Sequence, residues 1–161
     1  MEKVVFLDRD GVINNPHEHY YVHKIEDFEI NTGMVEGLQT LIAKGYKFVL
    51  ISNQGGISKG EFSIEDVDNL HAHMLAEFNQ HGIEFLDIYY CPHHDTIEKC
   101  LCRKPEPLML EKAIARYDID REQSYFIGDK QSDIDAGIRA GVKTILIDKN
   151  QDIREVIHLI S

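Results

Sequence analysis

Val4-Val5-Phe6-Leu7 is an apolar run that ends at Asp8-Arg9-Asp10-Gly11, where two carboxylates stand two residues apart. A short apolar run bounded by polar residues indicates a buried strand. Ligands of open parallel α/β sheets bind beyond the carboxyl ends of the strands. We therefore expect chemistry at this junction if strands and helices alternate along the rest of the chain. Two acids at such a position call for a cation.

The rest of the chain alternates between two patterns. Short apolar runs recur at residues 4–7, 48–51, 88–91, 125–127 and 144–147, and they predict five strands. Helical spacing occupies residues 35–44, 64–81, 108–117 and 133–140, and a last short helix is predicted over residues 152–160. Ser63, with Asp66 three residues later, predicts a capping box. The fold class is therefore α/β, a doubly wound, Rossmann-like parallel sheet with helices on both faces.

The length and composition predict one domain that spans residues 1–161. The chain has 161 residues, of which 43% are hydrophobic and 28% charged, a balance typical of globular proteins. Two segments, residues 14–32 and 91–106, show neither pattern, and we expect them to form loops over the edge that bears the acids. Neither leaves room for a large cap domain.

The charge and the apolar pattern limit the partners. The formal net charge of −11 disfavours general attraction to nucleic acid or to anionic membranes, so an anionic substrate requires local positive groups or a metal ion. No apolar run reaches the length of a membrane span or of a signal-peptide core. We therefore expect a cytoplasmic protein. A monomer is expected because no long exposed apolar stripe is evident.

Cysteine and histidine cluster in one stretch of the chain, at Cys91, His93, His94, Cys100 and Cys102. An odd number of cysteines without a secretory signal argues against disulfides, and the clustering with histidine predicts a metal site. Three thiolates and one imidazole suit tetrahedral Zn²⁺, and four protein ligands leave no open position, so the ion would be structural. Because Arg103 and Lys104 follow the last cysteine directly, the ion would hold these two basic residues in place.

Four polar motifs follow one another along the chain: Asp8 with Asp10, Ser52-Asn53-Gln54-Gly55-Gly56, Arg103-Lys104-Pro105, and Gly128-Asp129 with Asp133. Each is weak alone, because a carboxylate after a strand is often only a helix cap and a Ser-Asn pair is often only a turn. Together, in this order and spacing, they resemble the four motifs of the haloacid dehalogenase-like phosphohydrolases.

The resemblance implies phosphate monoester hydrolysis through an aspartyl phosphate. Asp8 would attack phosphorus, and Asp10 would protonate the departing oxygen and then activate the hydrolytic water. These roles require environments that push the two pKa values apart, so that Asp8 is an anion while Asp10 is protonated. Ser52 would donate a hydrogen bond to the phosphoryl group, and Lys104 would supply a positive charge to it.

The resemblance also implies two metal ions. Mg²⁺ would be held by Asp8, by the backbone carbonyl of Asp10 and by Asp129, because an all-oxygen site favours this ion. Asp133 would order metal-bound water. The Cys-x-His spacing resembles that of the family, which favours His93 over His94 as the fourth zinc ligand, giving a Zn²⁺ site of Cys91, His93, Cys100 and Cys102.

The loop over residues 91–106, which carries the cysteines, narrows the resemblance to particular families within this superfamily. Together with Asp-Arg-Asp-Gly-Val-Ile-Asn and Ser-Asn-Gln-Gly-Gly-Ile, it resembles the bacterial D,D-heptose 1,7-bisphosphate phosphatases and the related histidinol-phosphate phosphatases. The implied substrate is a small phosphorylated sugar, D-glycero-D-manno-heptose 1,7-bisphosphate, which loses one phosphate. The candidate substrate-binding residues are Arg9, Asn53, Gln54, Arg103, Lys130, His17, His19 and His23, and for the histidines a plain surface role is the alternative.

Two other functions fit parts of the pattern. Histidinol phosphate is the alternative substrate, and a substrate panel separates the two. A receiver-type signalling domain also places acids, a hydroxyl and a lysine around Mg²⁺, but it is phosphorylated on an aspartate after its third strand. Here the acid pair follows the first strand, and the chain adds a metal-binding loop that such domains lack.

Overall fold

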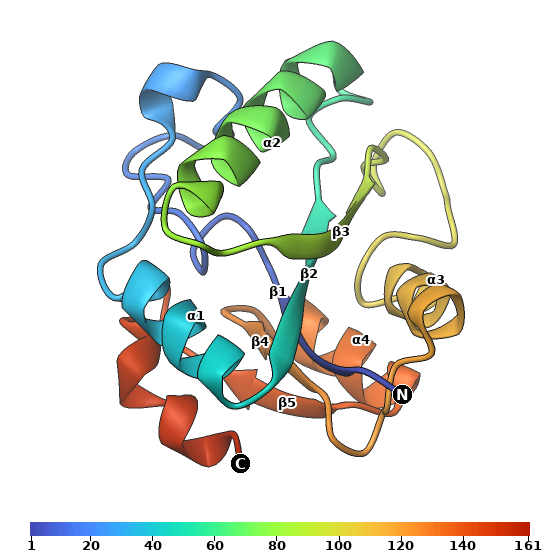
Figure 1. Ribbon diagram of the computed structural model, residues 1–161. Coiled ribbons are helices and arrows are strands. Elements are labelled where there is room, and N and C mark those ends of the chain that lie inside the picture. The colour runs from blue at the N-terminus through green and yellow to red at the C-terminus, as the bar shows by residue number, and fades with distance from the viewer.

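The structure is a computed structural model that describes residues 1–161. One sheet of five parallel strands forms the centre of the protein (Figure 1). The strands lie in the order β3-β2-β1-β4-β5. They are β1 (Lys3–Leu7), β2 (Tyr46–Asn53), β3 (Phe85–Cys91), β4 (Tyr125–Gly128) and β5 (Lys143–Leu146). The helices are α1 (Met34–Ala43), α2 (Ile64–Asn79), α3 (Leu108–Tyr117) and α4 (Gln131–Ala140). The predicted fold class is confirmed.

The sheet is buried on both faces, as Figure 1 shows with α1 and α2 on one side and α3 and α4 on the other. The central strand β1 serves both cores because its side chains alternate between the two faces. Val5 and Leu7 pack with α1 and α2, whereas Val4 and Phe6 pack with α3 and α4. All four side chains are fully buried. A strand buried on both faces has no polar positions, which explains the unbroken apolar run.

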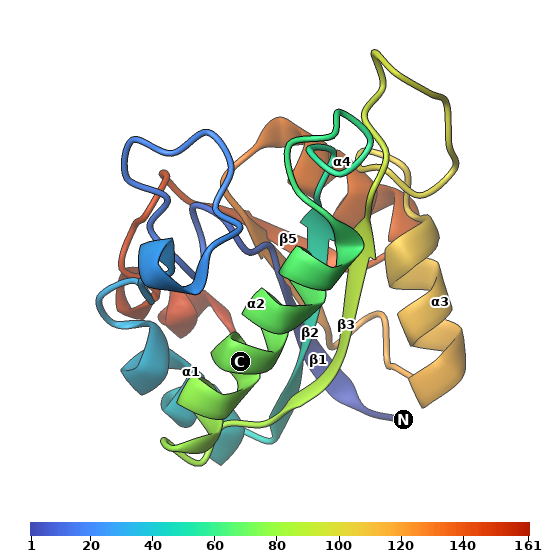
Figure 2. The same ribbon diagram turned by 90° about the horizontal axis from the view of Figure 1, so that it is seen from above.

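The sheet has its switch point at β1. Leu7 pairs with Leu50 of β2 on one side and with Ile127 of β4 on the other, so consecutive crossovers run to opposite sides of this strand. The loops that follow the strands rise from the same edge of the sheet in Figure 2. A crevice at a switch point is where open α/β sheets bind ligands. The acids at the end of β1 therefore stand at the place that the topology favours.

The predicted helix over residues 152–160 is wrong. Two short 3₁₀ turns, Ile153–Glu155 and Ile157–Leu159, occupy this stretch instead. Ile153 and Ile160 are both fully buried at its two ends, and the Asp152 side chain accepts a hydrogen bond from the Arg154 amide. These two apolar anchors fix the path of the chain, and the first turn packs against α1, where Ile153 lies over Gly37.

The other elements fall where they were predicted, with shifted ends. The capping box of α2 is present, with the Ser63 side chain accepting from the Asp66 amide and the Asp66 side chain accepting from the Ser63 amide. With 16 residues, α2 is the longest helix, and none of the helices combines the length and apolarity that crossing a membrane requires.

Candidate active site

Three carboxylates meet at the switch point of the sheet. Asp8 follows β1, Asp129 follows β4, and Asp133 comes from the first turn of α4; one oxygen of each lies within 4.8 Å of the others. Asp129 Oδ1 is buried without a hydrogen-bond partner. Buried polar atoms normally have partners, so an orphaned oxygen in an acid cluster points to a cation. The all-oxygen donor set fits Mg²⁺.

The backbone at Gly11 makes room for this cluster. Gly11 has a φ of +87°, and a Cβ atom added there would lie 2.4 Å from Asp129 Oδ2. A side chain is therefore excluded twice, by the left-handed backbone and by the acid that it would strike. Glycine at this position lets the loop after β1 approach the loop after β4.

Lys104 places a buried positive charge against two of the three acids. Its ammonium lies 2.8 Å from Asp8 Oδ1 and 2.7 Å from Asp133 Oδ1, and it donates to the carbonyl of Ile51 at 2.9 Å. The residue is 4% exposed. Burial opposes the charge, but the two carboxylates raise the pKa of Lys104 to about 12. Lys104 is thus a fixed positive charge at the end of β1.

The two acids after β1 have different surroundings. Burial raises the pKa of Asp8 to about 7, with Lys104 opposing the shift and the negative charges of Asp133 and Asp129 adding to it. Burial also disfavours the Asp10 anion, but the Arg9 guanidinium and hydrogen bonds from Asn14 and Gln54 outweigh it and lower the pKa of Asp10. The pKa values are pushed apart as predicted, but in the opposite direction, because Arg9 folds back onto Asp10 rather than facing the ligand.

The motif at the end of β2 is hydrogen bonded to neighbouring residues. Ser52 is 1% exposed, and its hydroxyl accepts from Gln54 Nε2 at 2.8 Å. The Asn53 amide spans two loops: its Oδ1 accepts from the Lys104 amide at 3.0 Å, and its Nδ2 donates to the Lys104 carbonyl at 3.2 Å. Asn53 therefore fixes the backbone that carries the buried lysine.

A small cavity of about 50 Å³ opens over these groups and is lined by polar residues only: Asp8, Asp10, Asn53, Lys104, Lys130, Ser132 and Asp133. The lining carries three acids and two lysines. An anionic group that enters the cavity therefore meets fixed cations and, where a metal is bound, the ion itself.

Two residues that were predicted to bind substrate, Arg9 and Gln54, face the interior of the protein instead of the cavity. Arg9 is fully buried and Gln54 is 2% exposed, and both side chains are occupied by hydrogen bonds within the protein. Neither lines the cavity. A polar residue next to an active-site acid can face the interior as easily as the ligand, and the sequence does not distinguish the two directions.

The other candidates divide into two groups. Asn53 and Lys130 line the cavity. Arg103 does not, and its Nη1 instead donates to the His93 carbonyl in the cysteine loop at 3.0 Å. His17 and His19 form exposed ion pairs with Glu29 and Asp27 and do not line the cavity. His23 does not line the cavity either, and its ring stacks on the Phe62 ring with centroids 5.1 Å apart.

Three residues near the site were not singled out from the sequence. Asn14 Nδ2 donates to Asp10 Oδ1 at 3.0 Å, Ser132 lines the cavity, and His71 of α2 contacts the guanidinium of Arg9 at 3.1 Å. The signal for His71 was available, since it occupies a position of the helical stripe that is otherwise apolar.

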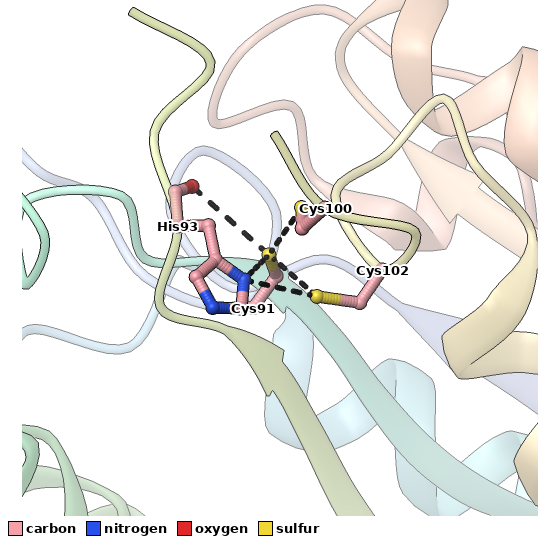
Figure 3. A group of neighbouring side chains, drawn as sticks. All are labelled: Cys91, His93, Cys100 and Cys102. Atoms are coloured by element: carbon pink, nitrogen blue, oxygen red, sulfur yellow. Dashed lines mark hydrogen bonds between the residues drawn. The ribbon is translucent and has the colours of Figure 1, made fainter. Parts of the chain in front are cut away.

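The cysteine loop gathers a second group of side chains that could hold a metal ion. Cys91, His93, Cys100 and Cys102 point toward one another, as Figure 3 shows, and each offers a ligand atom within 4.8 Å of the others. His93 Nδ1 lies 3.4 Å from Cys91 Sγ and 3.3 Å from Cys102 Sγ. Three sulfur atoms and one ring nitrogen at this spacing fit a tetrahedral Zn²⁺.

The thiols of this centre differ in ionisation. Burial raises the pKa of Cys91, whereas Cys100, despite its partial burial, has a pKa lowered to about 7 by hydrogen bonds from the Arg103 and Cys102 amides. His94 lies outside the cluster, with its Nδ1 at 2.7 Å from the Thr96 hydroxyl. Of the two histidines, it is His93 that lies together with the three cysteines.

The fold and the acid cluster with its buried lysine define a class of phosphoryl-transfer enzymes, and comparison with known proteins identifies it. The HAD-hydrolase-like family matches residues 101–158. A D-glycero-alpha-D-manno-heptose-1,7-bisphosphate 7-phosphatase of Photorhabdus laumondii is 43% identical over 146 residues, which are 87% of this chain and 79% of the relative. A D-glycero-beta-D-manno-heptose-1,7-bisphosphate 7-phosphatase of Pasteurella multocida is 42% identical over 96% of this chain and 86% of the relative.

Solved structures agree. A D,D-heptose 1,7-bisphosphate phosphatase from B. bronchiseptica, complexed with magnesium and phosphate, has a TM-score of 0.84 and 29% identity, and the match covers 98% of this chain and 86% of that one. The chain is a phosphatase of the haloacid dehalogenase-like superfamily. Within this superfamily it belongs to the family of the heptose 1,7-bisphosphate phosphatases.

Proposed function

We propose that this phosphatase removes the 7-phosphate of D-glycero-D-manno-heptose 1,7-bisphosphate. The observation that carries the proposal is the cluster of Asp8, Asp129 and Asp133 around Lys104, in a chain whose relatives are named for this reaction. The cavity beside the cluster is lined by polar residues, which suits the reacting phosphate, and the elements of the chain include no cap domain that would enclose the rest of a polyhydroxylated substrate.

Asp8 acts as the nucleophile. One carboxylate oxygen forms a bond to phosphorus while the bond between phosphorus and the C7 oxygen breaks, and Asp10 gives its proton to that oxygen. Water then attacks the aspartyl phosphate, Asp10 takes the proton of that water, and free phosphate leaves with Asp8 restored. Asp10 must carry a proton when the reaction starts. A bound phosphate dianion favours this state, because a nearby negative charge raises the pKa of a carboxyl group.

The remaining polar groups hold the transferring phosphoryl group. Ser52 donates a hydrogen bond to it, and Lys104 supplies a positive charge to it. Asn53 keeps Lys104 in place through the two hydrogen bonds to its backbone. Asp8, Asp129 and the Asp10 carbonyl would hold Mg²⁺, with Asp133 ordering its water, and the ion would supply positive charge to the phosphoryl oxygens. The same charge favours Asp8 as a carboxylate, which attack on phosphorus requires.

Zn²⁺, held by Cys91, His93, Cys100 and Cys102, has a structural role in this proposal. The loop leads directly into Arg103 and Lys104, and Arg103 is hydrogen bonded to the carbonyl of the ligand His93. A fixed loop therefore fixes the two basic residues. Arg103 and Lys130 are the residues that we propose to bind the part of the substrate that does not react, whereas His17 and His19 remain candidates only at the rim.

The setting of the enzyme follows from the same features. Three cysteines that serve as metal ligands require a reducing compartment, so we infer a cytoplasmic enzyme. The net charge of −11 argues against nucleic acid as a partner. The five strands form one sheet that both cores share, so residues 1–161 act as a single domain, and we propose that the chain works as a monomer.

A substrate panel tests the proposal. Phosphate release is measured with Mg²⁺ for both anomers of heptose 1,7-bisphosphate, for histidinol phosphate and for fructose 1,6-bisphosphate, with Asp8→Asn as the blank. We expect kcat/KM for one heptose anomer to exceed that for the other compounds by about 10² or more, roughly 2.7 kcal/mol of transition-state binding. A preference for histidinol phosphate would overturn the proposed substrate and leave the chemistry standing.

A further inference from the structure

Arg9 stands between the two catalytic acids in the sequence, yet its side chain is fully buried. Its Nη2 donates to the Val22 carbonyl at 2.6 Å and to Asp10 Oδ2 at 3.1 Å, and its Nε lies 3.3 Å from Asp10 Oδ1. A buried guanidinium is held where every N–H finds an acceptor, because an unsatisfied one is costly. Arg9 therefore binds the protein and not the ligand.

Asp10 is held by this guanidinium and by two amides. Besides Arg9, its carboxylate accepts from Asn14 Nδ2 at 3.0 Å and lies 3.4 Å from Gln54 Nε2. About a third of the side chain remains exposed, toward the cavity. The orientation of the proton donor is thus set by groups behind it, and Arg9 is the one that makes several contacts with it.

The far end of Arg9 is anchored by one residue of helix α2. Arg9 Nη1 lies 3.1 Å from His71 Nε2, and His71 is 4% exposed. The Tyr90 ring of β3 packs edge-on against the imidazole, with centroids 5.5 Å apart. His71 is the only protein group that contacts Nη1 at hydrogen-bond distance.

The contact fixes the state of the imidazole. A guanidinium only donates, so Nε2 of His71 accepts and the ring proton resides on Nδ1. Burial and the positive charge of Arg9 lower the pKa of His71 to about 3, so the ring is neutral at physiological pH. The buried site thus fixes both the charge and the tautomer of the ring, whereas an exposed histidine could be neutral or protonated.

We propose that His71 is a positioning residue for catalysis: its imidazole anchors Arg9, and Arg9 in turn holds the Asp10 carboxyl group in the orientation that delivers a proton to the leaving oxygen. The proposal rests on the proposed role of Asp10. It assigns a function in the reaction to a residue of α2 that touches neither substrate nor metal. It also explains why a basic residue inside the acid motif is turned away from an anionic ligand.

Two amide variants test the anchor with little change in size or polarity. Glutamine at this position carries an oxygen near the place of Nε2 and can accept from Arg9, whereas the oxygen of asparagine lies near the place of Nδ1 and cannot reach it. His71→Gln and His71→Asn are compared with the wild type and with His73→Gln, a change on the same helix at a partly exposed side chain. His71→Leu repeats the loss of the acceptor in case asparagine unfolds the protein.

The readout is the dependence of kcat/KM on the leaving group, measured with aryl phosphates from dinitrophenyl to phenyl and with an alkyl phosphate. Good leaving groups depart without a proton, so a misplaced general acid harms only the poor ones. We expect His71→Asn to lower kcat/KM for the alkyl phosphate by about 10- to 100-fold, a part of the full effect of a general acid, and to leave dinitrophenyl phosphate within about threefold. His71→Gln and His73→Gln should keep the wild-type slope.

An equal loss for all leaving groups in His71→Asn would overturn the proposal, because it would show a merely structural role. So would an unchanged slope in both His71→Asn and His71→Leu. In an Asp10→Asn background, His71→Asn should have no further effect on the alkyl phosphate, since both changes remove one function. Failure of the proposed reaction is a separate outcome, in which the wild type itself shows no turnover above the Asp8→Asn blank.

The tautomer gives a second test that does not depend on turnover. The ¹⁵N shifts of the His71 ring at pH 7 should show an unprotonated Nε2 and a protonated Nδ1. The reverse tautomer, or an imidazolium, would contradict the anchor whatever the kinetics show.

Discussion

Asp8 and Asp10 have the same side chain, but they have different charged partners, and the partner of Asp10 is the residue between them, Arg9. Arg9 contacts Asp10 at 3.1 Å, while Lys104 contacts Asp8 at 2.8 Å. Each acid thus has its own cation, one from its own motif and one from a loop 96 residues further along the chain. At the scale of single residues, the site is a set of charge pairs rather than a set of isolated acids.

Gly11→Ala tests the close approach of the two acid-bearing loops. The new methyl group would strike Asp129, so we expect kcat/KM to fall by about 10² or more, as when one preorganised group is lost. Gly82→Ala is the matched control, because Gly82 also has a positive φ, +71°, but nothing lies within 4 Å of its added Cβ. It should cost about 1 kcal/mol of stability through the backbone and leave activity intact. Equal activity of the two variants would refute the account.

The pH dependence of stability tests the state of His71. Its pKa is lowered from 6.5 to about 3 on folding, so the unfolded chain takes up a proton between these values and the folded chain does not. This part of the stability is complete above pH 6.5 and is lost as pH falls toward 3, at up to roughly 1.4 kcal/mol per pH unit. Urea unfolding of the wild type and of His71→Gln from pH 8 to 4.5 measures it. The stability difference between the two proteins should change in favour of His71→Gln as pH falls, and a constant difference would be inconsistent with a neutral His71.

At the scale of elements, most of the site follows from where strands end. The carboxyl ends of parallel strands meet at one edge, so Asp8 and Asp129 could be brought together from the sequence alone. The direction of side chains within a loop could not. Arg9 and Gln54 were expected to face the substrate, but both turn inward. The acceptors of Arg9 come from other segments, the Val22 carbonyl and His71 of α2, whereas Gln54 donates to Ser52 of its own motif.

The same limit applies to the end of the chain. Residues 152–160 carry apolar residues at spacings that a helix would also show, and the sequence favoured that element. The structure has two 3₁₀ turns because Ile153 and Ile160 must both reach the core. Regular elements are predictable where one face is buried along their whole length, as in α2, and less so where a segment is fixed only at its ends.

Removal of zinc tests the link between the cysteine loop and catalysis. A chelator selective for Zn²⁺ over Mg²⁺, used with Mg²⁺ in excess, should lower kcat/KM by about 10², because Arg103 and Lys104 lose their fixed positions. The far-UV circular dichroism should change little, since the sheet and the four helices lie outside the loop. Added Zn²⁺ should restore activity. Full activity of a protein shown by metal analysis to be free of zinc would exclude this role.

At the scale of the whole molecule, β1 contributes side chains to both hydrophobic cores, so we expect the protein to unfold as one cooperative unit. Phe6 packs in the core beneath α3 and α4, and its neighbour Leu7 packs in the core beneath α1 and α2. Neither core can lose its sheet face without disturbing the other. The strand that leads into Asp8 and Asp10 is therefore also the strand that joins the two halves of the fold.

Core truncations on opposite faces of β1 test this unity. We expect Phe6→Ala to cost about 3–5 kcal/mol and Leu7→Ala about 2–5 kcal/mol, and each to shift a single unfolding transition. Urea unfolding followed by circular dichroism, with hydrogen exchange of the α2 and α3 amides, measures it. If Phe6→Ala loosened α3 and left the protection of α2 unchanged, the two faces would be independent.

The most direct test of the central claim is to follow both phosphates of heptose 1,7-bisphosphate by ³¹P NMR while the enzyme acts with Mg²⁺. Both anomers are supplied separately, and Asp8→Asn is run beside the wild type. The account predicts that the signal of the 7-phosphate disappears, that the 1-phosphate signal persists and free phosphate appears, and that Asp8→Asn leaves the spectrum unchanged. Loss of the 1-phosphate first, or turnover that survives in Asp8→Asn, would contradict it.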